Sequence, residues 1–412
     1  MEKMIEAASD LHDLFDAMNG ITTLGRAERE RLLDMVADRA YPPRRVEREA
    51  QSDDAAGTGG WYRWENGSGR RWIAPAAAAQ GVRFESLAEI TASEPDLAAR
   101  IIERAGTAQK VALAEALDGF ARETIVLYVP RGVRTGGDFL LDAALSEAGR
   151  LGAMRVWTLL EDDSEATFTL NLRSGSGSGE ILFLNPVTFV VGGNALLKAH
   201  EIQDFHENAF CIRDTTMTIG TDGSVDWITA EVGSARSMAE LTVNLVGDGA
   251  QARINGVFFG NLDQRITMNT RQNHYGRNSY SSLLYKGAVR DQAHATWTGM
   301  IYVDPKATGT DGYQKNDNLV LDPEARVFAR PGLEIVTNDV KCSHGTTMTE
   351  IDRNQVFYLT SRGISEEEAR GLIIDGFFGS ILDSISSDPI RERIESHIHA
   401  KLNRCERTVE SR

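Results

Sequence analysis

A cysteine and a histidine lie two residues apart near the C-terminal end of the chain, at Cys342 and His344. They follow a strand-like run from Leu333 to Val336. In an extended strand, residues i and i+2 point to the same face, so this sulfur and an imidazole nitrogen could bind one soft metal ion. The adjacent Lys341 is expected to lower the thiol pKa modestly. Two donors fill only half of a tetrahedral metal site. The alternative to metal binding is a structural role for both residues.

The other cysteines and histidines are weaker candidates. Cys211 lies between bulky apolar residues and is predicted to be a buried core thiol. Cys405, among charged residues near the C-terminus, is interpreted as a bystander. His397 and His399 would lie on different faces of one helix, which argues against shared ligation. Single histidines in polar, β-prone segments are predicted to be structural: His274 and His294.

The sequence contains none of the common motifs for nucleotide hydrolysis or hydrolytic catalysis. It has no Gly-x-x-x-x-Gly-Lys-Ser/Thr, no Gly-x-Ser-x-Gly and no His-Glu-x-x-His. The glycine–serine run at 174–179 lies between two β-prone segments and is predicted to be a turn rather than a phosphate loop. The chain is therefore not expected to be an enzyme of these classes, and a partner would have to bring any ATP that is used.

Composition limits the class of protein and its partners. The 412 residues suggest two or three structural units, with 42% hydrophobic and 25% charged residues. No apolar run reaches the roughly 18 residues of a membrane span, and a net charge of −16 disfavours nucleic acid as a partner. The first residues are acidic and lack a secretory signal, and three widely spaced cysteines suit a reducing compartment. A soluble, cytoplasmic protein is expected.

The chain divides into three segments by texture. Residues 1–124 are predicted to be a helical domain, with apolar stripes around Leu32 to Val36 and from Leu87 to Phe120, and a loop or irregular element around Trp61. Residues 125–359 consist of short β-prone runs broken by Gly, Asp and Asn. Residues 360–412 are predicted to be helical again, beginning with a capping box at Ser365.

Recurring turn elements indicate how the β-rich segment folds. The stretch 219–224 resembles 246–250, and 303–307 resembles 321–325, at irregular spacings of roughly 20 to 26 residues. A period in this range favours a β-solenoid, in which stacked coils share one core. A sandwich or barrel would need hairpin turns every ~8–12 residues, and the pattern alone leaves both architectures open.

An ordered series of motifs then narrows the choice. The series resembles the SufB/SufD family of the SUF iron–sulfur cluster assembly system, densely from about Gly299 to about Phe378 and more thinly upstream. The segments that carry the resemblance are Val129–Val133, Lys286–Gly299, Thr308–Asp311, Gln314–Leu321, Pro331–Ile335, Cys342–Gly345, Phe357–Ile364 and Gly376–Phe377.

The resemblance implies a fold and a function. It implies a parallel β-helix core between helical N-terminal and C-terminal domains, in a scaffold protein rather than a turnover enzyme. It implies that Cys342 and His344 contribute to a transient iron–sulfur cluster at a subunit interface. The chain has Asn316 where SufB-type scaffolds carry a ligand cysteine, and Ser343-His344-Gly345 where they carry Glu-His-Glu. It therefore looks SufD-like, or like a homodimeric archaeal SufB.

The resemblance also implies two partners. One is a second SufB/SufD-type protomer that completes the ligand set, in a homodimer or a heterodimer. The other is a SufC-like ABC ATPase docking on the C-terminal helices, on a face that includes Phe377 and Phe378. Two alternatives remain: a β-solenoid enzyme such as a carbohydrate lyase or an acyltransferase, and a β-solenoid binding protein in which Cys342 and His344 are inert.

Overall fold

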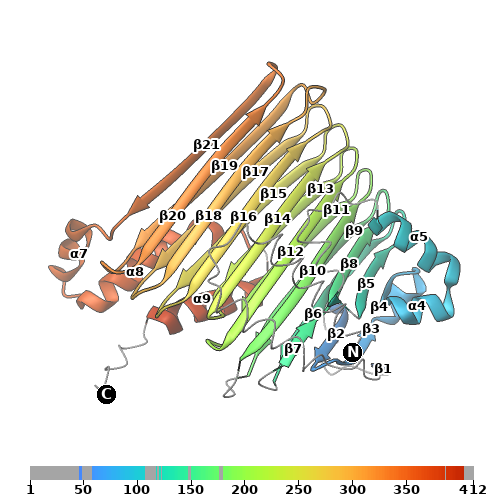
Figure 1. The fold of residues 1–412 in the computed structure, drawn as a ribbon, viewed down its shortest axis with the longest axis horizontal. Coiled ribbons are helices and arrows are strands. Elements are labelled where there is room, and N and C mark those ends of the chain that lie inside the picture. Colours follow the sequence, from blue (N-terminus) through green and yellow to red (C-terminus); the bar gives the residue numbers. More distant parts are fainter. Residues whose placement is uncertain are drawn as a thin grey trace, which may run out of the picture.

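We describe residues 46–48, 58–106, 117, 120, 121, 123–146, 150–175, 180–385 and 387–402 of a computed structural model of the chain. Within these residues, the protein is mainly β, with two sheets that face one another (Figure 1). Three features of the sequence lie outside the described residues. They are the expected helix around Leu32 to Val36, most of the end of the helical pattern before Phe120, and the cysteine Cys405.

The first sheet has eleven strands, and the last of them, β21, lies at its edge. In spatial order they are β1 (Val46–Arg48), β3 (Ser68–Ile73), β2 (Thr58–Glu65), β6 (Arg134–Leu145), β9 (Glu165–Ser174), β11 (Leu196–Asp204), β13 (Ser224–Glu231), β15 (Gln251–Gly260), β17 (Tyr280–Val289), β19 (Thr310–Val320) and β21 (Val340–Thr349).

The second sheet has ten strands and ends at the edge strand β20. In spatial order they are β20 (Arg326–Ile335), β18 (His294–Val303), β16 (Arg265–His274), β14 (Arg236–Leu245), β12 (Ala209–Ile219), β10 (Ile181–Val191), β8 (Arg155–Leu160), β5 (Thr124–Val129) and β4 (Arg83–Ser86), with β7 (Arg150–Ala153) beside β10. From β9 to β21, the chain alternates between the sheets and neighbouring strands run parallel. This is the predicted β-solenoid.

Most coils are longer than the predicted 20 to 26 residues. Phe210 pairs with Arg236 and His294 pairs with Arg326, so one coil takes from 26 to 32 residues. The turns at 219–224 and 246–250 do stack, because Val246 N donates to Ile219 O. The turns at 303–307 and 321–325 follow strands of different sheets, β18 and β19. The spacing between them is therefore not the length of one coil.

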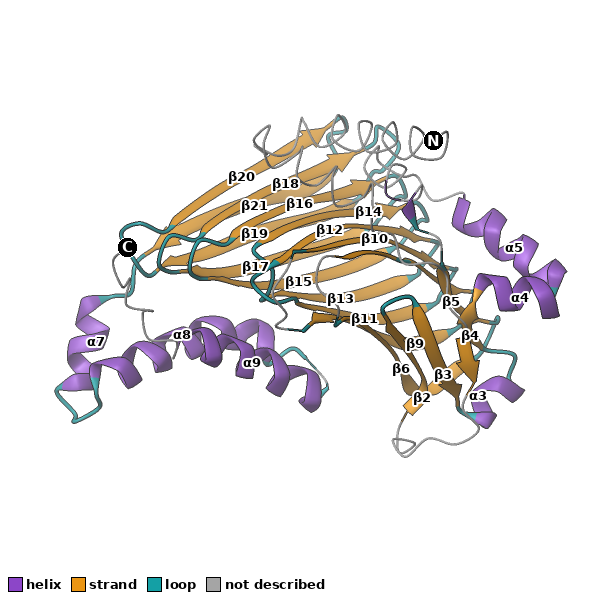
Figure 2. Cartoon of the chain, turned by 60° about the horizontal axis from the view of Figure 1, so that its bottom comes forward, coloured by secondary structure: helices purple, strands orange, loops and turns teal. Residues whose placement is uncertain are grey.

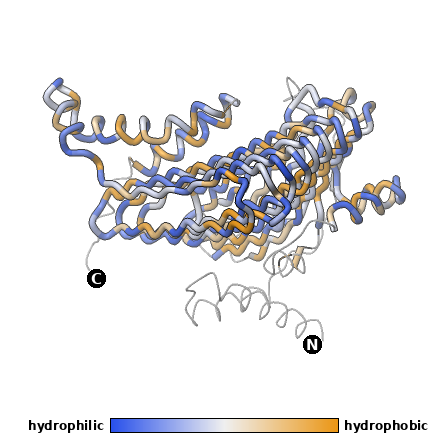
Figure 3. The backbone as a smooth tube through the Cα atoms, turned by 90° about the horizontal axis from the view of Figure 1, so that it is seen from above, coloured by the Kyte–Doolittle hydropathy of each residue, from blue (hydrophilic) through white to orange (hydrophobic). Residues whose placement is uncertain are grey.

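Apolar side chains fill the space between the sheets. Hydrophobic and hydrophilic residues are interspersed along the coils (Figure 3), and strands such as β17 and β18 alternate between buried and more exposed positions, as expected where one face of a strand packs on the core. Aromatic rings meet edge to face along the core, with ring centroids 6.1 Å apart for Phe168 and Phe189 and 5.4 Å apart for Phe189 and Trp227. Each coil therefore packs against its neighbours, as in other repeat proteins.

Three helices follow the last strand: α7 (Arg353–Thr360), α8 (Glu366–Leu382) and α9 (Asp388–Leu402). The Ser365 capping box is confirmed, since Ser365 Oγ accepts from Glu368 N and the Glu368 carboxylate accepts from Ser365 N. Helices α8 and α9 cover the outer face of the eleven-stranded sheet (Figure 2), burying Ile374, Phe378 and Ile394 against Val257 and Phe259, among others. The helices begin at Arg353, before the predicted boundary at residue 360.

The described N-terminal residues mix helices and strands, so an all-helical domain up to residue 124 is not confirmed. Helices α4 (Leu87–Ser93) and α5 (Pro95–Gly106) pack against the outer face of the ten-stranded sheet, and α3 (Pro75–Ala79) is short. The prediction of a loop or irregular element around Trp61 is wrong, because these residues form strand β2, which pairs with β3 and β6. No helix in the described part of the chain has both the length and the apolar character needed to cross a membrane.

Helix α9 is fixed to the solenoid by a buried lysine. Lys401 Nζ donates to Phe259 O at 2.6 Å and to Gln264 Oε1 at 2.7 Å. Burial lowers the pKa of Lys401 to about 7 from an ordinary value of 10.5. Nearby, His397 Nε2 lies 3.1 Å from Asp204 Oδ2, and Arg290 Nη1 donates to Leu402 O.

We predict that docking of α9 strengthens as the pH rises from about 7 towards 10. The pKa of Lys401 is lower in the docked state than in the undocked state. Between pH 7 and pH 10 the undocked state therefore binds more protons, so a rise in pH favours the docked state. The gain is on the order of 2–5 kcal/mol for a fully buried amine. Hydrogen exchange of the α9 amides at several pH values, after correction for intrinsic exchange rates, would measure it. A Lys401→Met variant should lack the gain, and an equal slope in both proteins would contradict the prediction.

Candidate metal site at the open end of the solenoid

Cys342 and His344 lie on the edge strand β21, at the end of the solenoid where no further coil covers them among the described residues. Gly312 of β19 pairs with Cys342, and Gln314 pairs with His344. Cys342 is half-buried beside Ile301, while His344 is exposed. The two residues share a strand face, as predicted, so a thiol and an imidazole lie at an accessible edge.

The environment of Cys342 differs from the prediction in one respect. Burial raises the pKa of the Cys342 thiol, the carboxylate of Asp311 raises it further, and a hydrogen bond with the Gly312 backbone opposes the rise. The expectation that Lys341 lowers this pKa is wrong. Lys341 is adjacent in an extended strand, so it points to the opposite face and is exposed. The sulfur is therefore a protonated thiol at pH 7, and metal binding must displace that proton.

The described residues of one chain do not supply a complete ligand set. Among the described residues, no group of three or more His, Cys, Asp or Glu side chains is placed to hold a metal ion. Asn316 has a structural role: its Nδ2 donates to Tyr285 O, and its Oδ1 accepts from Asn318 Nδ2. A tetrahedral iron site built on Cys342 and His344 would need donors from elsewhere.

Apolar side chains are exposed around the same end of the solenoid. Met348 of β21 is 53% exposed and Val336, just after β20, is 55% exposed. Phe328 of β20 and Tyr313 of β19 are exposed as well. Edge strands with exposed apolar residues form surfaces that other chains can cover, so the two candidate ligands lie within a possible protein interface.

The other candidates from the sequence are separate from this site. Cys211 is buried, as predicted, and burial raises the pKa of its thiol to about 12. His397 contacts Asp204 of β11, whereas His399 contacts Asp375 of α8 at 2.7 Å, so they share no ligand, as predicted. His294 is exposed. In contrast, His274 is buried between the two sheets, and burial lowers its pKa to about 4.

The predicted docking phenylalanines pack against the solenoid. Phe378 is fully buried under α8, and Phe377 is half-buried, with Lys286 Nζ 4.8 Å from its ring centroid. The Lys286 amine also donates to Phe377 O at 2.6 Å. In this conformation, Phe378 has no surface to offer a partner.

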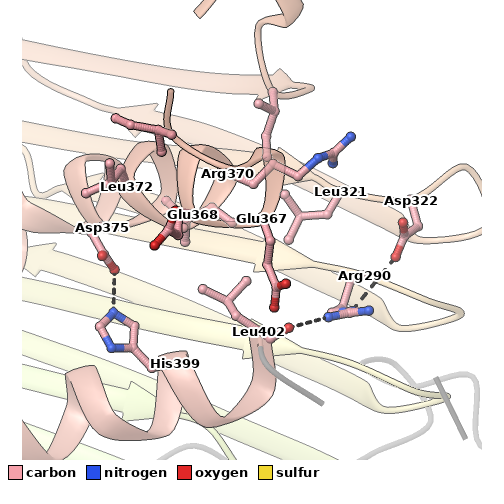
Figure 4. A pocket seen from close by; sticks show the side chains of 14 residues that line it. Arg290, Leu321, Asp322, Glu367, Glu368, Arg370, Leu372, Asp375, His399 and Leu402 are labelled. Carbon is pink, nitrogen blue, oxygen red and sulfur yellow. Dashed lines mark hydrogen bonds and ion pairs between the residues drawn. The ribbon is translucent and has the colours of Figure 1, made fainter. Parts of the chain in front are cut away.

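The exposed apolar residues of the C-terminal helices lie elsewhere, at positions that were not predicted to dock a partner. Phe357 of α7 is 72% exposed and Leu372 of α8 is 52% exposed. A pocket of about 590 Å³ lies between α8, α9 and the ends of β17 and β19 (Figure 4). Its lining is half apolar and half charged or ionisable, and carboxylates outnumber the cationic side chains. The residues that line it are Arg290, Leu321, Asp322, Ile351, Ile364, Glu367, Glu368, Arg370, Gly371, Leu372, Ile374, Asp375, His399 and Leu402.

Comparisons with known proteins identify relatives of this chain. Residues 144–377 match the family model described as SUF system FeS cluster assembly, SufBD core domain. An iron–sulfur cluster assembly SufBD family protein of Mycobacterium leprae is 33% identical over 246 residues, which are 58% of this chain and 62% of that protein. The iron–sulfur cluster assembly protein SufD of Bacillus subtilis is 25% identical over 279 residues, and that of Escherichia coli is 28% identical over 239 residues. These alignments cover 67% and 58% of this chain and 63% and 52% of the two SufD proteins.

Proposed function

Because the chain belongs to the SufBD family of the SUF iron–sulfur cluster assembly system, we propose that it is a scaffold subunit that holds a nascent cluster as cargo. Similarity to two SufD proteins supports a SufD-like role, and a homodimeric SufB-like role is the second version. The alignments span just under two thirds of the mycobacterial relative, so the function of the whole protein is part of the proposal. We propose that this cluster assembly takes place in the cytoplasm.

The observation that carries the proposal is the position of Cys342 and His344. A thiol and an imidazole are donors suited to iron, and both lie on the last strand of the solenoid beside exposed apolar residues. A second protomer covering this edge would bury Met348 and bring further donors to the same place. The cluster would then be assembled between two protomers and released when they separate. No catalytic step by this chain is required.

A SufC-like ATPase is the second proposed partner. We place its docking surface on the exposed apolar residues of α7 and α8, Phe357 and Leu372, because Phe378 is buried. Helices α8 and α9 are packed against the solenoid, and α7, which precedes them, begins shortly after β21, so a movement of these helices on ATP binding could reach the candidate site.

The two contacts can be tested separately by substitution. We expect Phe357→Asp to lower the affinity for the ATPase at least about tenfold and to leave scaffold pairing intact, since hot-spot aromatic residues often contribute 2 kcal/mol or more. We expect Met348→Asp to do the reverse. Mass measurement of the purified complexes, with and without the ATPase, reads out both contacts and distinguishes a homodimer from a heterodimer. A complex of unchanged mass in both variants would contradict the proposed surfaces.

A further inference from the structure

The inner face of the last coils places a second imidazole next to Cys342. His274 is at the end of β16, in the opposite sheet, and Gly312 of β19 lies near both residues. A Cβ atom added to Gly312 would lie 3.3 Å from Cys342 Sγ and 3.5 Å from His274 Nε2. The sulfur and the nitrogen therefore both lie close to one point in the lumen that the missing side chain of Gly312 leaves free, with Ile301 Cγ2 as the third neighbour at 3.4 Å.

We infer that Cys342 and His274 of one protomer form a metal-binding pair across the solenoid lumen, over Gly312. His274 is then a further ligand for the iron that the protein handles, and this inference rests on the proposed function. A metal at that point would require Sγ to approach by about 1 Å and Nε2 by about 1.4 Å to reach typical bond lengths. Side-chain rotation at Cys342, which is half-buried on an edge strand, supplies the movement of Sγ, and the His274 ring supplies that of Nε2 by moving away from the Ser281 hydroxyl.

The hydrogen bonds around His274 orient it as a ligand. Ser279 Oγ donates to Gly276 O, so it accepts the Nδ1 proton of His274 at 2.7 Å. This leaves the lone pair on Nε2, which accepts from Ser281 Oγ at 2.8 Å. Metal-binding histidines in proteins usually donate their second ring N–H to a fixed oxygen in this way. The Nε2 lone pair would exchange the Ser281 hydroxyl for the metal.

Two buried amide oxygens on the same strand faces as His274 and Gly312 support a ligand in the lumen. Gln272 lies two residues before His274, and Gln314 lies two residues after Gly312, so each shares a strand face with the residue it flanks. Both are buried, and their Oε1 atoms have no hydrogen-bond partner among the described residues. Buried polar atoms without partners are rare in native proteins and often mark a bound water or ion. The open end at Cys342 gives an ion access.

Cobalt titration of the full-length chain tests the inference without cluster assembly. Co²⁺ bound by a thiolate gives a charge-transfer band in the near ultraviolet, and the thiol proton passes to the buffer. We expect Cys342→Ala to abolish the band and His274→Gln to weaken Co²⁺ binding at least about tenfold. We also expect Gly312→Ala to weaken binding, because its methyl group occupies the space between the two donors.

The matched control is Gly345→Ala on β21, where an added Cβ would have only Lys315 Cγ within 4.0 Å and should leave Co²⁺ binding unchanged. Thermal unfolding shows which variants fold, and if His274→Gln does not, Gly312→Ala decides alone. Wild-type affinity in either folded variant would overturn the inference. If His274→Gln and Gly312→Ala bind Co²⁺ normally while Cys342→Ala still loses iron in the assembled complex, the pairing of His274 with Cys342 is wrong and the proposed function stands. If Cys342→Ala keeps both metals, the proposed function fails too.

Discussion

Replacing Cys342 by alanine is expected to lower the iron and sulfide retained by the assembled complex at least about tenfold. Cys342 is the one thiol at the open end of the solenoid in the described part of the chain. Because few metal donors surround it there, the loss of one should have a large effect. The measurement is anaerobic reconstitution with Fe²⁺ and sulfide in the presence of the partner protomer and the ATPase, with iron counted per complex. His344→Ala should also lower iron, because its imidazole shares the strand face of Cys342.

Lys341→Ala is the matched control for this experiment. The lysine is adjacent to Cys342 but exposed on the other face, and it has no part in the raised thiol pKa. Its removal should leave iron loading unchanged. Equal iron in wild type, Cys342→Ala and His344→Ala would favour the alternative of a β-solenoid binding protein without metal chemistry. Loss of iron in Lys341→Ala alone would show that charge, not ligation, governs loading.

The class of fold could be predicted from the sequence, but the length of its coils could not. The repeat is carried by Asp, Asn and Gly residues with positive φ at one corner of the solenoid, at positions 163, 194, 222, 249, 278 and 309. Such residues tolerate the left-handed conformation that the corner requires. Of the two pairs of turns that look alike in sequence, 303–307 and 321–325 lie at different corners, and their short spacing made the predicted period too short.

The candidate site was predictable only where it is local in sequence. Alternation along one strand placed Cys342 and His344 together, and the same rule would have placed Lys341 on the opposite face. His274 lies in the other sheet, several strands earlier, so only the stacking of coils brings it near Cys342. The burial of Phe378 was hidden for another reason. Apolar residues occur on all sides of α8, so the sequence did not indicate which face packs on the solenoid.

The sequence also gave no sign of a buried ion-pair network inside the solenoid. The Arg213 guanidinium lies between the carboxylates of Glu201 and Glu231, and all three residues are buried. Ser237 Oγ donates a further hydrogen bond to Glu231 at 2.8 Å. Burial raises the pKa of Glu201, and Arg213 opposes this rise. The three residues lie on β11, β12 and β13, so the network joins both sheets.

Arg213→Met is therefore expected to destabilise the protein by about 3–5 kcal/mol at pH 7, because it leaves two buried carboxylates without a cation. Without Arg213, the folded pKa of Glu201, which burial already raises, rises further above its unfolded value. The loss should then be smallest below the unfolded pKa and grow as the pH rises towards the folded one. Thermal unfolding between pH 5 and pH 8 would measure this, and hydrogen exchange on β11 to β13 would locate it, since solenoid coils can unfold locally.

The triple variant Glu201→Gln, Arg213→Met, Glu231→Gln is the matched control. It removes the buried charges together with their partner, so it should recover much of the lost stability and lose the dependence on pH. A single variant as stable as wild type at pH 7 would mean that water reaches the carboxylates in solution. A triple variant as unstable as the single one would instead assign the effect to packing, because a methionine fills less of the lumen than a guanidinium held between two strands. Only recovery in the triple variant supports the network as an electrostatic link between the two sheets.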